Sequence, residues 1–331
     1  MPDMSKNNMF INQNLNDYWS VLNIKQTLNA VELVEQECFS ALCKKMNLFK
    51  VSFPDEVFLA TGLDSVIGVD NFHKAVVLNK TAKWGRCAIK KYGISSGEGI
   101  AYFAKIKQNC SNNGYDYAFE NNLCWERILN IENICMPRLE EEVLIVSEII
   151  KVAAKKILKE HGILNEIFGS DLKCLTAQHL ENLYPDFSPI QREYAICKKY
   201  GVVFVEQVGS ILNSGNTHLI CDPDIDDWSF SGVLLVWNSR FGYSQNIATI
   251  GIRVLWNKMV EQFNYYGLNV PNLSFHNLLK KGILPCTIGG SINLSFLSML
   301  LLNKMHIGEV ASGVWSDITL LEAEKRGIHL L

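Results

Sequence analysis

The stretch from Leu284 to Trp315 constrains the fold of this chain more than any other part of the sequence. Pro285 and the pair Gly289-Gly290 predict a tight turn, because glycines let a backbone pass close to another group without a Cβ in the way. The run from about Leu294 to Asn303 predicts a helix that is apolar nearly all round and therefore buried. Its length is too short to cross a bilayer, which takes ~20 residues. We therefore expect a turn and a buried helix at this place.

Several segments have the spacing and the end signals of amphipathic helices. Apolar residues at helical spacing predict a helix from Lys25 to Met46. The segment from Pro137 to Gly162 has a proline at its start, acidic residues in its first turn and a glycine after its end. Ser188-Pro189 begins another helix, which runs to Lys199. Two more are predicted from Leu255 to Tyr266 and from Ser274 to Lys281, with Ser274 as a possible cap.

The segments between these helices are typical of short strands with little polar content. Their ranges are 75–78, 81–89, 100–106, 118–129, 202–205, 233–237 and 248–254. Residues 49–60 predict another strand, which Pro54 interrupts, so it should lie at a sheet edge or a subunit boundary. Because strands and helices do not alternate regularly, the order favours an α+β fold with an antiparallel sheet. We expect a single domain over residues 19–331, after a loosely ordered, asparagine-rich segment 1–18.

Composition argues against several classes of function. The chain has 331 residues, a net charge of -3 and no long basic run, so we expect no nucleic-acid partner. We find no secretory signal and no spanning segment, so we expect a cytoplasmic location and no membrane partner. The ten cysteines include no CxxC pair, which predicts reduced thiols and no metal cluster.

Six short motifs occur in order along the chain before the C-terminal signature. They are Ala82-Lys83-Trp84 with Arg86, Ser96-Gly97-Glu98-Gly99, Trp125-Glu126-Arg127, Asp226-Asp227-Trp228-Ser229, Leu235-Val236-Trp237-Asn238 and Gly251-Ile252-Arg253-Val254. Together with TIGG-x-I-x-x-S, an apolar helix, HIGEV and a tryptophan, this set resembles the ammonia-dependent asparagine synthetases, also called aspartate–ammonia ligases. The resemblance covers roughly residues 45–320 and implies the antiparallel core of class II aminoacyl-tRNA synthetases, flanked by helices.

The resemblance also implies a chemistry. In that family ATP activates the side-chain carboxylate of aspartate as an acyl-adenylate, and ammonia then displaces AMP. This reaction needs arginines for the phosphates, carboxylates for Mg²⁺ and polar groups that hold the amino acid. The resemblance thus implies ATP and Mg²⁺, an amino-acid-like small molecule as ligand, and a homodimer through residues 25–60. An edge strand in a monomer is the alternative interpretation of that segment.

The functional residues of the family carry over to two groups of positions. The catalytic candidates are Arg86, Asp226, Asp227 and Arg253. The candidates for the substrate or nucleotide pocket are Asp70, Asn122, Glu126, His218, Asn246, Thr249, Gly251, Gly289, Gly290 and Ser295. Each also has a structural interpretation: an aspartate pair after a proline is typical of a turn, and a strand arginine can pair with a neighbouring carboxylate.

Charged residues of the family pattern are replaced at several positions. Gln108 and Phe296 stand where the family has arginines, and Asn246 stands where it has a metal-binding glutamate. Gly85 replaces an expected lysine. Each lost charge-assisted contact is worth about 1.5–3 kcal/mol, so these replacements argue against ordinary binding of ATP and Mg²⁺.

Two cysteines also fall at positions of charged family residues. Cys124 replaces a carboxylate that holds aspartate, and Cys221 replaces an arginine three residues after His218. Nearby positive charge favours the thiolate, so the two thiols are candidates for covalent chemistry in a shared pocket. The alternative is that both are small apolar fillers.

Two functions from different classes stay open. The first is a carbon–nitrogen ligase of the aspartate–ammonia type with an altered substrate. The second is a pseudoenzyme, a dimeric ligand-binding or regulatory protein without ligase activity. A tRNA-charging enzyme is disfavoured, because the sequence predicts neither a second domain nor a basic surface for tRNA.

Overall fold

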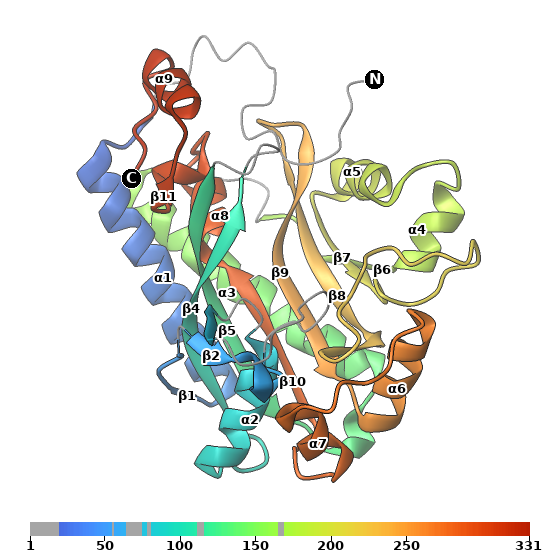
Figure 1. Ribbon diagram of the computed structural model, residues 1–331. Coiled ribbons are helices and arrows are strands. Elements are labelled where there is room, and N and C mark those ends of the chain that lie inside the picture. The colour runs from blue at the N-terminus through green and yellow to red at the C-terminus, as the bar shows by residue number, and fades with distance from the viewer. Residues whose placement is uncertain (1–19, 55, 64–74, 78–80, 111–115, 165–168) are drawn as a thin grey trace.

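The computed structural model describes residues 20–54, 56–63, 75–77, 81–110, 116–164 and 169–331. A large twisted sheet runs through the molecule, with helices on both of its faces (Figure 1). Its strands are β1 (Leu48–Lys50), β4 (Gly99–Asn109), β5 (Tyr117–Ile128), β6 (Lys173–Thr176), β7 (Val202–Glu206), β8 (Asp226–Asn238), β9 (Tyr243–Arg253), β10 (Thr287–Asn293) and β11 (Gly313–Val314). A separate small sheet pairs β2 (Glu56–Phe58) with β3 (Ala75–Val77).

The strand order of the large sheet is β1-β4-β5-β10-β9-β8-β7-β6, and β11 pairs with one end of β5. The β1–β4 and β6–β7 pairs are parallel, whereas the other pairs of this sheet are antiparallel. The predicted α+β fold with a mostly antiparallel sheet is therefore confirmed. β1 lies at one end of the order, which agrees with the edge position expected for residues near Pro54.

The predicted helices form where the sequence places them. They are α1 (Ile24–Met46), α3 (Met136–His161), α5 (Pro189–Tyr200), α6 (Trp256–Tyr265), α7 (Ser274–Lys280) and α8 (Leu294–Leu301). Asn23 and Gln26 form a capping box at α1, and Gly162 ends α3 in the left-handed conformation. The remaining helices are α2 (Ala82–Tyr92), α4 (Ala177–Leu183), α9 (Asp317–Lys325) and the 3-10 turns Leu59–Thr61, Ile131–Asn133 and Ile307–Glu309.

Three local expectations are wrong. The segment 81–89 was expected to be a strand, but it lies in α2. Ser274 does not cap α7, because Leu273 takes the cap position without a side-chain hydrogen bond. Gly289-Gly290 does not form a turn but lies inside the extended strand β10.

The two faces of the sheet differ in character. On the rear face, side chains such as Trp125, Ile250 and Ile288 pack into the main apolar core with α1, α3 and α8. We call the other face the front face; it carries Cys124, Ser291 and Thr249 side by side on β5, β10 and β9. α2 covers one end of the front face, and α4 and α5 cover its other end. Between them Thr249 is exposed although its strand lies in the middle of the sheet, so the front face is open there.

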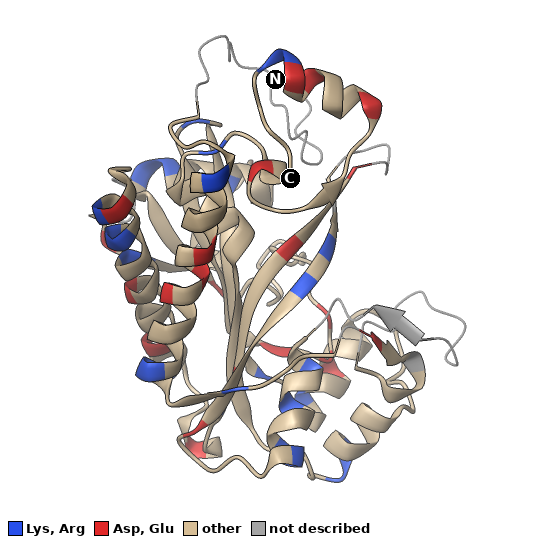
Figure 2. Ribbon diagram, turned by 90° about the vertical axis from the view of Figure 1, so that its left-hand side faces the viewer, with Lys and Arg blue, Asp and Glu red and all other residues tan. Residues whose placement is uncertain are grey.

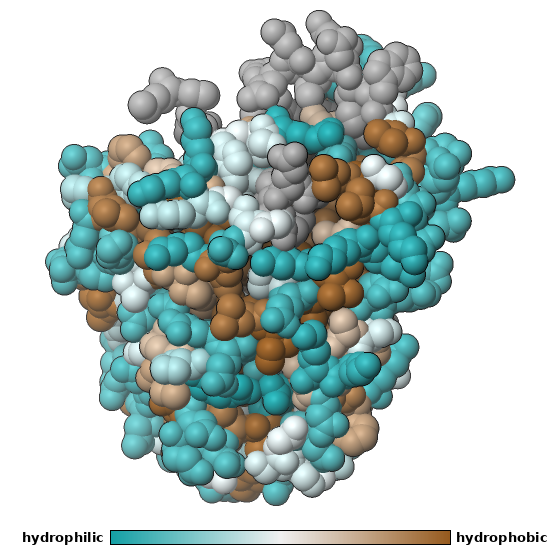
Figure 3. All heavy atoms as spheres, turned by 180° about the vertical axis from the view of Figure 1, so that it is seen from behind, coloured by the Kyte–Doolittle hydropathy of each residue, from teal (hydrophilic) through white to brown (hydrophobic). Residues whose placement is uncertain are grey.

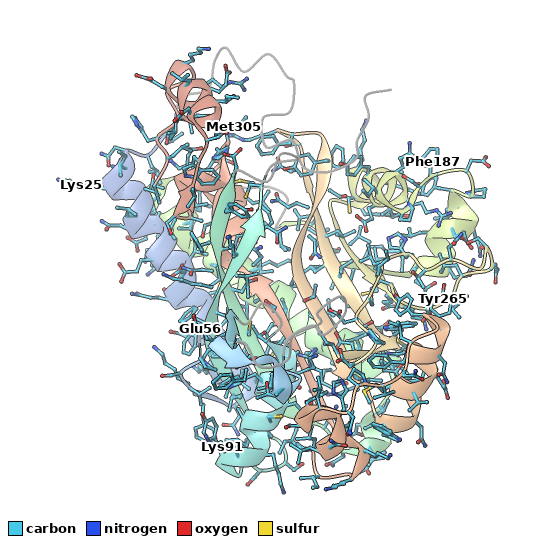
Figure 4. All side chains as sticks on the ribbon, in the orientation of Figure 1. Lys25, Glu56, Lys91, Phe187, Tyr265 and Met305 are labelled. Atoms are coloured by element: carbon cyan, nitrogen blue, oxygen red, sulfur yellow. The ribbon has the colours of Figure 1, made fainter. Side chains whose placement is uncertain are left out.

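Three further features concern the outer face of the molecule, the small sheet and the helices. Seen from behind, apolar side chains reach the surface in several places between polar ones (Figure 3). Figure 4 places Glu56 of β2 in front of the large sheet, with Lys91 at the end of α2 below it. In the part of the chain that the structure describes, no helix is both long enough and apolar enough to span a membrane.

Candidate functional site

Three predicted residues meet in a buried ion cluster at one end of the front face. The Arg253 guanidinium at the end of β9 donates from Nε to both oxygens of Glu126 at 3.0 Å and from Nη2 to Glu126 Oε2 at 2.8 Å. Its Nη1 donates to Asp226 Oδ1 at 2.5 Å. Burial alone would lower the pKa of Arg253, but the carboxylates of Glu126 and Asp226 raise it above its usual value. The guanidinium is therefore fixed by groups of the protein itself.

The glycines of the family motifs make room for this cluster. A Cβ at Gly289 would lie 2.4 Å from the backbone oxygen of Trp125 and 2.5 Å from Glu126 Oε2. A Cβ at Gly251 would lie 2.7 Å from Asp226 Oδ1. Gly290 faces the rear, where a Cβ would meet the Trp125 ring at 2.6 Å. These glycines serve close packing of neighbouring strands and not the predicted turn.

A second buried ion cluster was missed by sequence reasoning. Lys83 Nζ of α2 lies 2.9 Å from Asp224 Oδ2, and His276 Nε2 of α7 lies 2.9 Å from the same oxygen. Burial would raise the pKa of Asp224, but the His276 hydrogen bond and the Lys83 charge lower it below its usual value. Lys83 stands in the quoted Ala82-Lys83-Trp84 motif and Asp224 two residues before Asp226, whereas His276 carried no signal.

Arg86 of α2 is buried near the first cluster, since the charges of both Glu126 and Arg253 act on it. Its Nε donates to the backbone oxygen of Pro285 and its Nη1 to that of Val254, both at 2.8 Å. Its Nη2 is buried without a hydrogen-bond partner. Burial lowers the pKa of Arg86 to about 10, although the Glu126 charge opposes this. Arg86 thus links α2 to the segments that precede β10 and follow β9.

A chain of uncharged polar groups crosses the middle of the front face. Thr81 Oγ1 donates to Cys124 Sγ at 3.4 Å, and Cys124 Sγ donates to Ser291 Oγ at 3.5 Å. Ser291 Oγ donates in turn to Asn122 Oδ1 at 3.2 Å. Burial raises the pKa of the Cys124 thiol above its usual value. This direction favours the neutral thiol, and with it the alternative that Cys124 is a small buried filler, because burial outweighs the charge of Arg253.

Cys221 and His218 lie outside this chain of groups. Cys221 packs against the core of α4 and α5, whereas Cys124 belongs to the core under α2, so the described residues place the two thiols in different apolar clusters. His218 Nε2 lies 3.0 Å from Glu193 Oε1. Asp227 Oδ1 accepts from the Ser229 amide at 2.9 Å, and burial raises the pKa of Asp227. All ten cysteines are free thiols, as predicted.

The replaced positions lie in different surroundings. Gln108 and Asn246 are exposed, as is Thr249. Phe296 packs against the rear apolar core at the start of α8, and its amide donates to Asn293 Oδ1 at 2.9 Å. Ser295 Oγ is buried and accepts from the Asn121 amide at 2.9 Å. Asp70 lies outside the described residues.

We next ask whether the residues of this site could bind the phosphates and the Mg²⁺ of an ATP-dependent reaction. Arg253 and Lys83 hold carboxylates of the protein, and Arg86 holds two backbone carbonyl oxygens, while its buried Nη2 has no partner among the described residues. Among the described residues no group of three or more His, Cys, Asp or Glu comes together as a metal site. These residues do not fit a Mg²⁺-bound triphosphate, which needs arginines and carboxylates that are free to bind it.

The fold places the chain in a known structural class. It aligns with asparaginyl-tRNA synthetase from Entamoeba histolytica at a TM-score of 0.59 and 13% identity, covering 87% of this chain and 66% of that one. The asparaginyl-tRNA synthetase of Pyrococcus horikoshii, solved with asparaginyl-adenylate, aligns at a TM-score of 0.60 and 12% identity, over 87% of this chain and 68% of that one. The chain therefore has the class II aminoacyl-tRNA synthetase catalytic fold but spans only about two thirds of these enzymes.

Sequence comparison defines the family within this class. Residues 25–327 match the family model described as aspartate-ammonia ligase. The chain is 32% identical to an aspartate–ammonia ligase of Bacillus cytotoxicus, over 95% of this chain and 99% of that protein. It is 31% identical to the enzyme of that name from Clostridium perfringens, over 95% and 98% of the two chains. The chain belongs to the aspartate–ammonia ligase family.

Proposed function

We propose that this member of the family binds a small amino-acid-like molecule on its front face and does not carry out ATP-dependent amide formation. The observation that carries the proposal is the pairing of the site's buried cations. Arg253 is held by Glu126 and Asp226, and Lys83 is held by Asp224. A triphosphate would have to break these buried pairs, and removing one partner of such a pair costs about 3–5 kcal/mol.

The replaced positions support the same proposal. Phe296 presents an apolar ring to the rear core where the family has an arginine, and Gln108 and Asn246 are uncharged and exposed. Cys124 is buried, and its raised pKa keeps the thiol neutral. The described site therefore supplies a polar, mostly uncharged surface in the middle of the sheet, which suits a small polar ligand better than a polyphosphate.

A calorimetric titration with ATP and Mg²⁺, with and without aspartate, tests the proposal. We expect no binding tighter than about 100 μM, which corresponds to roughly -5.5 kcal/mol. We also expect no release of AMP when aspartate and ammonium are both present. The Bacillus cytotoxicus relative, measured in parallel, is the matched control. Binding and AMP release by this chain at the control's level would contradict the proposal and favour a working ligase.

Further properties follow as proposals. The first is a cytoplasmic location, which is supported by the ten free thiols, because oxidising compartments favour disulfides. Nucleic acid is not a proposed partner, because the net charge of the chain is -3 and Asp and Glu lie among Lys and Arg on much of the side that Figure 2 shows. A homodimer through residues 25–60 is proposed on the basis of exposed apolar side chains there, including Leu28 and Phe49.

A further inference from the structure

Glu120 is a buried carboxyl group on the front face that neither ion cluster uses. It lies on β5 and shares the front side of this strand with Asn122, Cys124 and Glu126, since strand side chains alternate. Its neighbour across the strand pair is Ile106, which packs against the core under α2. Only 4% of Glu120 is exposed. A glutamate this deeply buried is rare unless it has a partner.

The carboxyl group is held in one orientation by a short relay. Glu120 Oε2 accepts from Asn293 Nδ2 at 2.7 Å. The Asn293 Oδ1 atom accepts from the amide of Phe296 at 2.9 Å, at the start of α8. The second oxygen, Glu120 Oε1, is buried and has no hydrogen-bond partner among the described residues. The protein therefore orients this carboxyl group and leaves one of its oxygens unsatisfied.

No cation of the described residues offsets this carboxyl group. Burial raises the pKa of Glu120 to about 7, and the Asn293 hydrogen bond opposes the shift without cancelling it. Burial also raises the pKa of the Cys110 thiol, and the negative charges of Glu120 and Asp116 add to that shift. Leaving a buried acceptor without a donor is costly, about 1–3 kcal/mol, so an external donor at Oε1 would be strongly favoured.

Polar residues on β5 and the neighbouring strand β10 lie between Glu120 and the exposed Thr249. Asn293 is half-buried on β10, and Ser291 precedes it on the same side. Thr249, paired with Ser291, is exposed on β9. Ser291, Asn122 and Asn293 therefore form a row of polar residues on the front face between the exposed Thr249 and the buried Glu120.

We propose that Glu120 is a specificity residue, whose free Oε1 accepts a hydrogen bond from an ammonium or guanidinium group of the ligand. The ligand is then a small cationic molecule, such as a basic amino acid or a polyamine. The protonated carboxyl loses its proton to the solvent when the cation binds, and a carboxylate–cation pair forms. The inference rests on the proposed ligand-binding role of the front face but does not depend on whether ATP binds.

Calorimetry with L-lysine and L-arginine tests the inference, and L-norleucine is the control that lacks the terminal cation. Titrations at pH 7 in phosphate and in Tris separate the heat of binding from the heat of proton transfer to the buffer. We expect lysine or arginine to bind and norleucine not to bind at up to about 10 mM. Binding should release protons to the buffer, because the raised pKa of Glu120 keeps part of the carboxyl groups protonated near pH 7 and the bound cation favours the carboxylate.

The variant Glu120→Gln should weaken binding of the cation at least about tenfold and abolish proton release, because the amide keeps the shape but not the charge. Glu132→Gln, at an exposed position, is the matched control and should leave both unchanged. Equal affinity of wild type and Glu120→Gln, binding of norleucine as tight as lysine, or no binding of either cation would overturn the inference. If Glu120→Gln did not fold, proton release by the wild type would decide.

Discussion

At the scale of single residues, the glycine at position 289 shows how closely the front face is built. Its neighbours are the backbone of β5 and the Glu126–Arg253 pair, neither of which can move without breaking the sheet or the ion cluster. We expect Gly289→Ala to lower the free energy of unfolding by about 2–3 kcal/mol, because the added methyl group overpacks the strand interface. Urea denaturation measures this change.

Gly169→Ala is the matched control for that experiment. A Cβ at Gly169 meets no atom within 4 Å, and its backbone does not have a positive φ. It should change the free energy of unfolding by less than about 0.5 kcal/mol. Equal stability of Gly289→Ala and Gly169→Ala would show that the close approach at Gly289 is not a constraint.

His306 makes the stability of the fold depend on pH. Burial lowers the pKa of His306 to about 4, although Asp116 opposes the shift. Its Nδ1 accepts from the Gly308 amide at 3.0 Å, which requires that this nitrogen carry no proton. Because the folded-state pKa lies below the ordinary 6.5, the stabilisation is fully present above pH 6.5 and is lost as pH falls toward 4.

We therefore expect the free energy of unfolding to drop by about 2 kcal/mol between pH 7.5 and pH 5 through His306 alone. His306→Asn should reduce this drop, since an asparagine oxygen can accept from the Gly308 amide without titrating. His179→Asn, at an exposed position, is the control and should leave the pH profile unchanged. Urea denaturation at the two pH values decides, and an identical slope in His306→Asn and wild type would contradict the assignment.

At the scale of helices and strands, the sequence predicts elements well when their ends carry local signals. The helices α1 and α5 have capping boxes, and α3 has Pro137 near its start and Gly162 after its end. These signals depend on neighbours in sequence, so no tertiary information is needed to recognise them. The long strands β8 and β9 were predicted only in their apolar parts, 233–237 and 248–254, and Asp226-Asp227, which is typical of a turn, begins β8.

The helix α2 could not be predicted in this way. Its buried side carries Lys83 and Arg86, and Gly85 lowers its helix propensity. The buried charges have partners far away in sequence, Asp224 for Lys83 and Val254 and Pro285 for Arg86. Hydrophobic periodicity cannot predict a helix that buries charged residues, because the spacing of apolar residues then indicates the buried side as the exposed one.

The candidate site was predictable to a similar degree. Arg253, Glu126 and Asp226 were identified through family motifs, and they do come together. Which charges pair with which could not be read from the sequence, because the pairing depends on strand register. Glu120 stands at no family motif, so its burial and its unsatisfied oxygen are visible only in the folded chain.

At the scale of the whole molecule, the sheet separates two kinds of environment. The rear face is closed by α1, α3 and α8 over the main apolar core. The front face holds two ion clusters, in which Arg253 and Lys83 are paired with carboxylates, and an open polar centre. Opening the front face to a ligand therefore does not expose the main core, and changes at the centre of that face can alter binding without loss of the fold.

The edge of this sheet is where we expect a second copy of the chain. β1 is the last strand in the order, with β4 as its neighbour, and Phe49 on it is 50% exposed. Ile24 and Leu28 expose apolar side chains on the preceding helix α1. An unpaired edge with apolar side chains is a template for association, so a homodimer that buries α1 and β1 explains both features.

Light scattering during gel filtration at micromolar concentration should give twice the mass of one chain. Phe49→Glu places a charge in the centre of the proposed interface and should shift the protein to the monomer, because burying an unpaired carboxylate is costly. Ile190→Glu is the matched control: this residue is exposed to a similar extent on α5, at the opposite end of the sheet (Figure 1), and its change should leave the dimer intact. If the wild type is a monomer, the proposed interface does not form. If Ile190→Glu breaks the dimer and Phe49→Glu does not, the interface lies elsewhere on the chain.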